Sequence, residues 1–145
     1  MKIEKQINIK CDDTELVPAH ALSGDAGLDL RSSEDLIIAP NEIALVSTGV
    51  IIELPNDTVG MVCSKSGLAL KNGIFVLNAP GIIDSGYRGE IKVILKNGGK
   101  SNYKIDKYSK IAQFVVLKFY KVSFNRTNEL SESVRGNKGF GSTGL

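Results

Sequence analysis

The chain has 145 residues, 42% of them hydrophobic, and its 18 Lys and Arg against 16 Asp and Glu leave a net charge of +2. That length favours one compact domain with a real core, and so mild a charge gives no support to nucleic-acid or membrane binding. No apolar run approaches the ~18–20 residues that cross a bilayer, and the N-terminus lacks the apolar stretch of a secretory signal. Cys11 and Cys63 lie far apart and His20 is the one histidine. We therefore predict reduced thiols in a cytoplasmic compartment, and exclude a His-dependent triad or a multi-His metal site within one chain.

The first half of the chain alternates short apolar runs with turn residues. Isoleucines at odd positions of 2–10 predict a first strand. Further strands are predicted by apolar runs bounded by Gly, Pro, Asn or Asp, at 28–30, 36–38, 43–46, 49–54 and 59–63. The run Leu68-Ala69-Leu70-Lys71, followed by Gly73, predicts the single helix.

The second half predicts a hairpin and one long strand. Apolar residues at 74–77 and an alternating run at 91–96 flank a tight glycine-bearing turn at 81–90, which is the pattern of a β-hairpin. A short strand is expected at 103–105 and a buried strand at 111–122, the longest apolar run. Many short strands with one helix favour an all-β fold, a barrel or jelly roll. Residues 125–145 are polar and glycine-rich, so we expect a β domain over 1–124 and a C-terminal arm over 125–145.

The predicted hairpin turn carries the first candidate functional residues. Asp84 is followed three residues later by Tyr87, between Gly81 and Gly89. A rigid turn that presents an acid and an aromatic ring together has the character of a site. Asp84 could instead do no more than hydrogen-bond the amides of the turn, a common use of Asp in loops.

The end of the chain is rich in groups that bind anions. Gly139, Gly141 and Gly144 satisfy a G-x-G-x-x-G pattern, but a dinucleotide fold is excluded because that motif must open a helix and the sequence stops one residue later. Glycine-rich backbone still lets N–H groups converge on an anion. Hydroxyl donors, positive charges and a ring that could cover a flat heterocycle stand beside them: Ser142, Thr143, Arg135, Lys138 and Phe140.

Two further segments have both a functional and an ordinary interpretation. Ser64-Lys65-Ser66-Gly67 precedes the predicted helix, where a hydroxyl and backbone amides form either an anion site or a plain N-cap. Asp25 and Asp29 flank a turn and are either solvated turn acids or carboxylates that hold Mg²⁺ through water.

Five segments, taken in chain order, together resemble the motifs of the homotrimeric dUTPase family, the dUTP diphosphatases. They span nearly the whole chain, at 26–30, 65–69, 78–89, 111–113 and 135–144. The third and fifth are long and specific. The resemblance implies a distorted jelly-roll, β-barrel-like fold with one short helix and a C-terminal arm, assembled as a homotrimer with three active sites. Each site would take the first, second and fourth segments from one subunit, the third from another and the arm from the last.

The same resemblance implies an activity, the hydrolysis of dUTP to dUMP and pyrophosphate. This would lower dUTP and supply dUMP for dTMP synthesis. Asp84 would be the general base that activates water for attack on the α-phosphorus, and Asp29 would hold a water bound to Mg²⁺ on the triphosphate. Tyr87 would pack on the deoxyribose and exclude a 2′-hydroxyl. The substrate-binding residues would be Lys65, Ser66, Gly67, Asn78, Gly81, Ile82, Ile83, Asp84, Tyr87, Lys92, Gln113, Arg135, Phe140, Gly141, Ser142 and Thr143.

Three positions depart from the family pattern. Lys65 stands where the family usually has Arg, so we expect fewer phosphate contacts from it, because an ammonium cannot make the planar two-pronged contact. Asn72 stands where His is frequent, and Lys138 where Gly is common.

Two alternatives remain beside dUTP hydrolysis. A dCTP deaminase shares the fold and resembles the second and third segments, but it lacks the closing arm around Phe140. The other alternative is a dUTPase-fold protein that acts as a regulatory binding partner. The presence of Asp84, Tyr87 and Arg135 speaks against a loss of catalysis.

Overall fold

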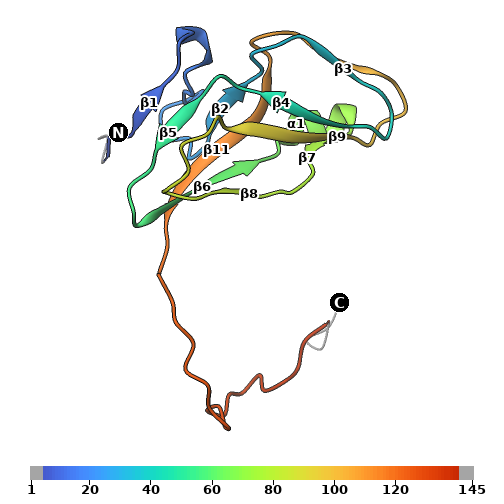
Figure 1. Ribbon diagram of the computed structural model, residues 1–145. Coiled ribbons are helices and arrows are strands. Elements are labelled where there is room, and N and C mark those ends of the chain that lie inside the picture. The colour runs from blue at the N-terminus through green and yellow to red at the C-terminus, as the bar shows by residue number, and fades with distance from the viewer. Residues whose placement is uncertain (1–4, 141–145) are drawn as a thin grey trace.

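Short antiparallel strands build the molecule, and the computed structural model describes residues 5–140 (Figure 1). The strands are β1 Asn8–Lys10, β2 Leu28–Arg31, β3 Leu36–Ile38, β4 Ile43–Ser47, β5 Ile51–Glu53, β6 Thr58–Cys63, β7 Ile74–Val76, β8 Gly81–Ile83, β9 Lys92–Asn97, β10 Tyr103–Ile105 and β11 Lys110–Lys118. A 3₁₀ turn, η1, covers Thr14–Leu16, and the helix α1 covers Ser66–Asn72. The all-β, jelly-roll-like fold with one short helix is therefore confirmed.

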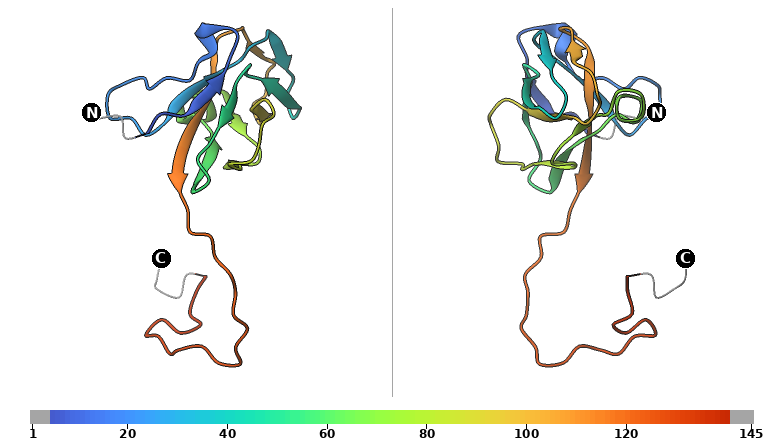
Figure 2. Two further views of the ribbon diagram at one scale, coloured as in Figure 1. Left: turned by 60° about the vertical axis from the view of Figure 1, so that its left-hand side comes forward. Right: turned by 90° about the vertical axis from the view of Figure 1, so that its right-hand side faces the viewer.

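The strands form four small sheets around one core. A four-stranded sheet has the order β2-β11-β6-β8, a three-stranded sheet the order β4-β9-β7, and β1-β5 and β10-β3 form two-stranded sheets (Figures 1 and 2). Side chains alternate between buried and partly exposed along β6, as strand geometry requires when one face is covered. Residues from all four sheets meet in a single hydrophobic cluster that includes Leu30, Val62, Val93 and Ile105.

The helix α1 ends before Gly73, as the sequence predicts, but begins at Ser66, two residues earlier than expected. Gly73 closes it with a left-handed φ of 68°, and its N–H donates to the carbonyls of Leu68 and Ala69. A side chain at position 73 would also collide with the backbone, because a Cβ there would lie 2.7 Å from the Gly99 nitrogen. The short helix leaves Ser66 and Gly67 exposed at its first turn, directly after β6.

The predicted hairpin pairs as expected, but its connection is not a tight turn. β7 and β9 are antiparallel partners, with Val76 opposite Leu95. Residues 77–91 between them include β8, which leaves this sheet and pairs with β6 in the four-stranded sheet, with Gly81 opposite Val62. The prediction of a simple turn was wrong because edge pairing with β6 extends the loop into a crossing between two sheets.

The first and last predicted strands are much shorter in the structure, and the strand expected at 49–54 is limited to β5, Ile51–Glu53. Residues 5–7 of the first are not in strand conformation, and residues 1–4 lie outside the described part. The last strand, β11, ends at Lys118 instead of continuing to Val122, because the partner strand β6 begins at Thr58, opposite Lys118. The Phe119 N–H makes a last hydrogen bond, to the Asp57 carbonyl at 3.2 Å. Beyond it the chain extends away from the folded body, without a helix or strand up to residue 140 (Figure 2).

Candidate active site

The order of the four-stranded sheet brings three of the singled-out segments side by side. In β11, Gln113 lies opposite Asp29 of β2 on one side and Cys63 of β6 on the other. The Gln113 Nε2 donates to the carbonyl of Ser64, the residue after β6, at 2.9 Å. Gly27 makes room for this amide, since a Cβ there would lie 2.7 Å from Gln113 Oε1. The segments at 26–30, 65–69 and 111–113 thus meet in one polar row.

Asp29 is the charged centre of this row. Its side chain is 9% exposed, and its two oxygens are taken by different lysines, Oδ1 by Lys65 and Oδ2 by Lys110 at 2.6 Å. Burial alone would raise the pKa of Asp29, but hydrogen bonds from Lys110 and Lys65 outweigh it and hold that pKa below its usual value. These ion pairs therefore stabilise the fold at neutral pH, and the contribution is lost as the pH falls through the lowered pKa.

The loop that carries Asp84 and Tyr87 is held by its own backbone contacts. The Tyr87 N–H donates to the Asp84 carbonyl at 3.0 Å, which closes a turn. Arg88 Nη1 donates to the carbonyls of Ser85 and Tyr87 at 2.7 and 3.0 Å, and the Tyr87 hydroxyl donates to the Glu90 carbonyl at 3.0 Å. The spacing between the acid and the ring is therefore fixed within the loop.

Glu90 ties the end of this loop to the rest of the fold. Its Oε1 accepts from the N–H groups of Thr48 and Gly49, at 3.1 and 2.8 Å, at the connection between β4 and β5. The next residue, Ile91, donates its N–H to the Val50 carbonyl at 2.7 Å. The sequence analysis did not single out Glu90, although an acidic residue between a glycine and a buried strand is a signal that could have drawn attention to it.

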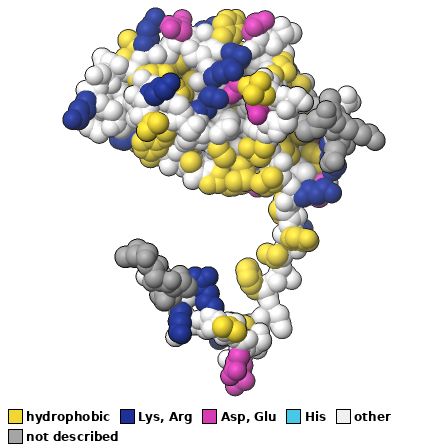
Figure 3. Space-filling model, turned by 180° about the vertical axis from the view of Figure 1, so that it is seen from behind, with side chains coloured by type: hydrophobic (Ala, Val, Ile, Leu, Met, Phe, Trp, Pro, Cys, Tyr) yellow, Lys and Arg dark blue, Asp and Glu magenta, His cyan; other side chains and the backbone are white. Residues whose placement is uncertain are grey.

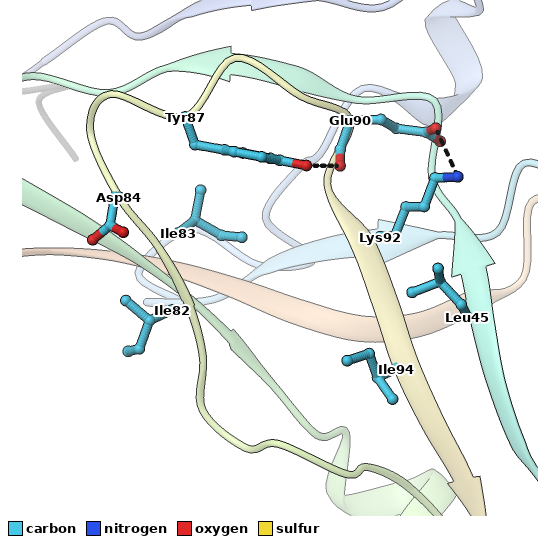
Figure 4. Close-up of a pocket in the computed structure, with 8 residues that line it drawn as sticks. All are labelled: Leu45, Ile82, Ile83, Asp84, Tyr87, Glu90, Lys92 and Ile94. Carbon is cyan, nitrogen blue, oxygen red and sulfur yellow. Dashed lines mark hydrogen bonds and ion pairs between the residues drawn. The ribbon is translucent and has the colours of Figure 1, made fainter.

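An open pocket of about 310 Å³ lies along the loop (Figure 4). Its lining residues are Leu45, Ile82, Ile83, Asp84, Tyr87, Glu90, Lys92 and Ile94. Figure 4 shows Asp84 and Tyr87 on one loop, with the Tyr87 ring reaching toward Glu90. Among the described residues, no hydrogen bond or ion pair engages the Asp84 carboxylate, so the suggestion that it merely satisfies the turn amides finds no support in these contacts.

The remaining candidates of the third segment lie against the same loop. Asn78 packs beside Gly81, where an added Cβ would lie 3.3 Å from Asn78 Nδ2. The peptide bond between Ala79 and Pro80 is cis, at the turn that reverses the chain into β8. Ile82 and Lys92 lie on the pocket wall, and Lys92 Nζ is 3.8 Å from Glu90 Oε2.

One chain does not bring all of the predicted site residues together. The pocket beside Asp84 is lined by none of Lys65, Ser66, Gly67 and Gln113, which belong to the polar row. Arg135 lies in the extended arm, in a local turn where its Nε donates to the Lys138 carbonyl at 3.3 Å. Phe140 is fully exposed. The predictions for Gly141, Ser142 and Thr143 fall outside the described residues.

The side chains of the polar row fit a metal ion that is held mainly by a bound ligand and not by the protein. Within residues 5–140, no group of three or more His, Cys, Asp or Glu side chains is arranged to hold a metal. A carboxylate has about four lone-pair sites, so Asp29 retains acceptor capacity beside its two lysines. That capacity suits a contact with a metal-bound water.

Gly89 lies under the Tyr87 ring, which gives a sharp test of the ring's position. A Cβ at Gly89 would come within 2.3 Å of the Tyr87 hydroxyl and 2.9 Å of Cε2. The resemblance to dUTPases implies that this ring excludes a 2′-hydroxyl. On that expectation, Gly89→Ala should swing the ring aside, break its bond to the Glu90 carbonyl and lower the ratio of kcat/KM for dUTP to that for UTP at least about tenfold, an effect of roughly 1.4 kcal/mol. Measuring kcat/KM for dUTP and UTP checks this.

Gly86 provides the matched control for that variant. It lies in the same loop, and nothing is within 4 Å of a Cβ built on it. Gly86→Ala should keep the ratio of kcat/KM for dUTP to that for UTP found in the unmodified chain. If Gly89→Ala also keeps that ratio, the position of the Tyr87 ring does not determine it.

The structure thus defines a jelly-roll-like β protein with two groups of polar side chains, the loop of Asp84 and Tyr87 beside a pocket and the polar row around Asp29. The dUTPase family model matches residues 14–144. The deoxyuridine 5′-triphosphate nucleotidohydrolases of Clostridium acetobutylicum and Clostridioides difficile are 53% and 50% identical, each over 94% of this chain and 94% or 95% of theirs. The dUTPase of Staphylococcus bacteriophage 80alpha, solved with dUpNHpp, superposes with a TM-score of 0.90 at 27% identity, over 97% of this chain and 99% of that one. The chain belongs to the dUTPase family.

Proposed function

We propose that this member of the dUTPase family cleaves dUTP to dUMP and pyrophosphate by attack of water on the α-phosphorus, with Asp84 as the general base. The observation that carries the proposal is the Asp84 carboxylate, which lies on a loop fixed by backbone contacts, lines the pocket and has no described partner to compete for it. An ionised carboxylate with free lone pairs can orient a water and accept its proton.

The pocket wall beside Asp84 suits a deoxynucleoside. Tyr87 lines the pocket and its hydroxyl is bonded to the Glu90 carbonyl. Its ring would lie against the deoxyribose and would leave no room for a 2′-hydroxyl. Asn78 and the backbone of 81–84 would read the edge of uracil, and Ile82, Ile83 and Lys92 would complete the wall. The side chain of Asn78 offers both a donor and an acceptor, which the alternating edge of uracil requires.

The polar row suits the triphosphate. Lys65, the exposed start of α1 at Ser66 and Gly67, and the amide of Gln113 would supply positive charge and N–H donors. Magnesium bound to the triphosphate would neutralise its charge. Asp29 would accept a hydrogen bond from a metal-bound water. Lysine at position 65 presents a point charge where an arginine would present a fork.

Because these two groups are separate in one chain, we propose that the active site forms in a homotrimer. Large apolar side chains are exposed on the single chain, among them Leu45 and Ile82 beside the pocket and Tyr120 and Phe124 after the last strand. Figure 3 shows such side chains along one edge of the folded body and at the start of the arm. Surfaces of this kind mark interaction sites.

Residues 125–145 would then be the arm that closes over a neighbouring subunit's site. In the described part, residues 125–138 are exposed and rest on nothing in their own chain. Arg135 would bind the γ-phosphate, Phe140 would cover uracil, and Gly141, Ser142 and Thr143 would donate to phosphate oxygens. Closure of this kind holds the reacting atoms in line and excludes bulk water.

The reaction would lower dUTP and supply dUMP for dTMP synthesis. None of the described helices is long and apolar enough to cross a membrane. Cys11 and Cys63 are both free, as reducing conditions favour, and we propose a cytoplasmic location on that ground.

Product analysis with dUTP, dCTP, UTP and dTTP side by side, with and without Mg²⁺, tests the proposed reaction. We expect dUMP and pyrophosphate from dUTP in the presence of Mg²⁺, and little turnover of the other three. Ammonia released from dCTP would instead identify a deaminase. Binding of dUTP without any product would point to a regulatory binding protein.

A further inference from the structure

Lys110 lies directly beside the polar row, and the proposed reaction gives it no role. It opens β11, three residues before Gln113, and its Nζ lies 2.6 Å from Asp29 Oδ2. Lys65 reaches the other oxygen, Oδ1, of the same carboxylate. The nearly buried Asp29 carboxylate therefore forms ion pairs with two lysines.

The two lysines differ in what else they can reach. Lys65 directly precedes Ser66 at the start of α1, where the proposed phosphate donors lie. Exposure does not distinguish the two lysines in its favour, since the Lys65 side chain is 28% exposed and that of Lys110 is 40% exposed. Lys110 lies on β11, opposite Arg31 of β2, and its ammonium group is directed to Asp29. Of the two lysines, Lys65 is therefore the one that would leave Asp29 to contact the phosphates of a bound triphosphate.

Removing a sole partner from a buried carboxylate is costly, because the charge is then left unpaired in a poorly solvated place. With Asp29 only 9% exposed, Lys65 could turn to a phosphate at low cost only if another cation stayed behind. Lys110 is that cation.

We propose that Lys110 is a positioning residue that keeps Asp29 paired and so allows Lys65 to exchange this carboxylate for the phosphates of the substrate. The inference rests on the proposed function, since it needs a triphosphate beside α1. Lys110 itself does not contact the substrate; its effect passes through Asp29 to Lys65.

The test compares Lys110→Met with Lys110→Arg, using KM and kcat for dUTP and the Kd of the non-hydrolysable analogue dUpNHpp. We expect Lys110→Met to raise KM and Kd about tenfold, a buried-pair effect reduced by partial exposure of Lys110, with kcat changed by less than about threefold. Lys110→Arg, which keeps the charge, should restore both constants to within about twofold. KM and Kd unchanged in Lys110→Met, or no recovery in Lys110→Arg, would overturn the inference.

Lys107→Met is the matched control. Lys107 lies three residues before Lys110 in the sequence, pairs with Asp13 at 3.4 Å and not with Asp29, and has a side chain that is 42% exposed. Its removal should leave the constants for dUTP within about twofold of the unmodified chain, as expected for an exposed pair. If KM and Kd rise equally in Lys107→Met and Lys110→Met, the effect is due to general surface charge, which would contradict the proposed exchange of Lys65 between Asp29 and the phosphates.

A double-mutant cycle separates the role of Lys110 from a direct phosphate contact. In an Asp29→Asn background there is no carboxylate charge to keep paired, so adding Lys110→Met should cost less than about twofold in Kd. A full tenfold loss in that background would mean that Lys110 acts on the substrate itself.

Nitrogen NMR of the lysine ammonium groups gives a measurement that needs no variant to fold. On addition of dUpNHpp, the Lys65 resonance should shift while the Lys110 resonance stays in place. A shift of Lys110 alone, or of neither, would refute the exchange. If the unmodified chain neither binds dUpNHpp nor forms dUMP, the proposed function fails and the inference with it, whereas normal turnover with unaffected lysine variants overturns the inference alone.

Discussion

Asp84→Asn should lower kcat by about 10²–10⁴-fold, the usual contribution of a general base. The substitution keeps the size and shape of the side chain but removes the group that takes the proton from water. The Asp84 carboxylate has no described hydrogen bond or ion pair to lose, and the loop is held by backbone contacts and Arg88, so the fold should not change. Single-turnover kinetics with dUTP, together with the Kd for dUpNHpp, measures the effect.

Asp106→Asn is the control for this substitution. Asp106 pairs with Lys104 on the surface, where both side chains are more than 60% exposed, and it lines no pocket near the loop. The control should be fully active. A kcat for Asp84→Asn within tenfold of the unmodified chain, or a Kd raised in step with the loss of kcat, would contradict the assignment of Asp84 as the base.

Removal of residues 135–145 should reduce turnover by at least about 10³-fold and leave the oligomer assembled. The arm would supply a phosphate clamp and a cover for the base, and losing about 4 kcal/mol of orientation and water exclusion accounts for that factor. Assembly should survive because the truncated chain keeps the exposed apolar side chains proposed to lie between subunits, among them those at 119–124. Light scattering and activity assays on one preparation check both parts.

A charge-neutralising change elsewhere on the arm serves as the control. Glu132 lies in the arm, fully exposed, before the Ser133–Gly136 turn. Glu132→Gln should keep most of the activity. Full activity in the truncated chain would refute the lid, and dissociation of the truncated chain would show that these eleven residues hold the oligomer together.

Local chemistry made most of the fold predictable. Alternation and turn residues place all three strands of the β4-β9-β7 sheet and three of the four strands of the other main sheet. The helix formers followed by Gly73 place α1, because each of these signals acts over a few residues. The end of β11 was missed because the apolar run continues to Val122, while the ladder depends on how far the distant strand β6 extends. β8 was missed for the same reason, since its partner is again β6.

In the candidate site, too, contacts between residues close in sequence could be predicted, and contacts between distant residues could not. The residues on the loop, Asp84 and Tyr87, are close in sequence, and the structure places both on one pocket. The link between Asp29 and Lys110 joins residues 81 positions apart through sheet register, which no local pattern reveals. The sequence indicates that Gly89 is a turn glycine, but the structure shows that it also leaves space for the Tyr87 side chain, which a Cβ at this position would fill.

The central claim is that the base and the arm of each active site come from different chains, and mixing two inactive variants tests it most directly. Asp84→Asn supplies an intact arm without a base, and the chain that lacks 135–145 supplies a base without an arm. The two chains are co-expressed with different tags and purified as mixed trimers. They should regain about a third of normal activity, since each mixed trimer then has one site in three that combines the base of one variant with the arm of the other. Mixed oligomers that form but remain as inactive as either variant alone would contradict the shared site.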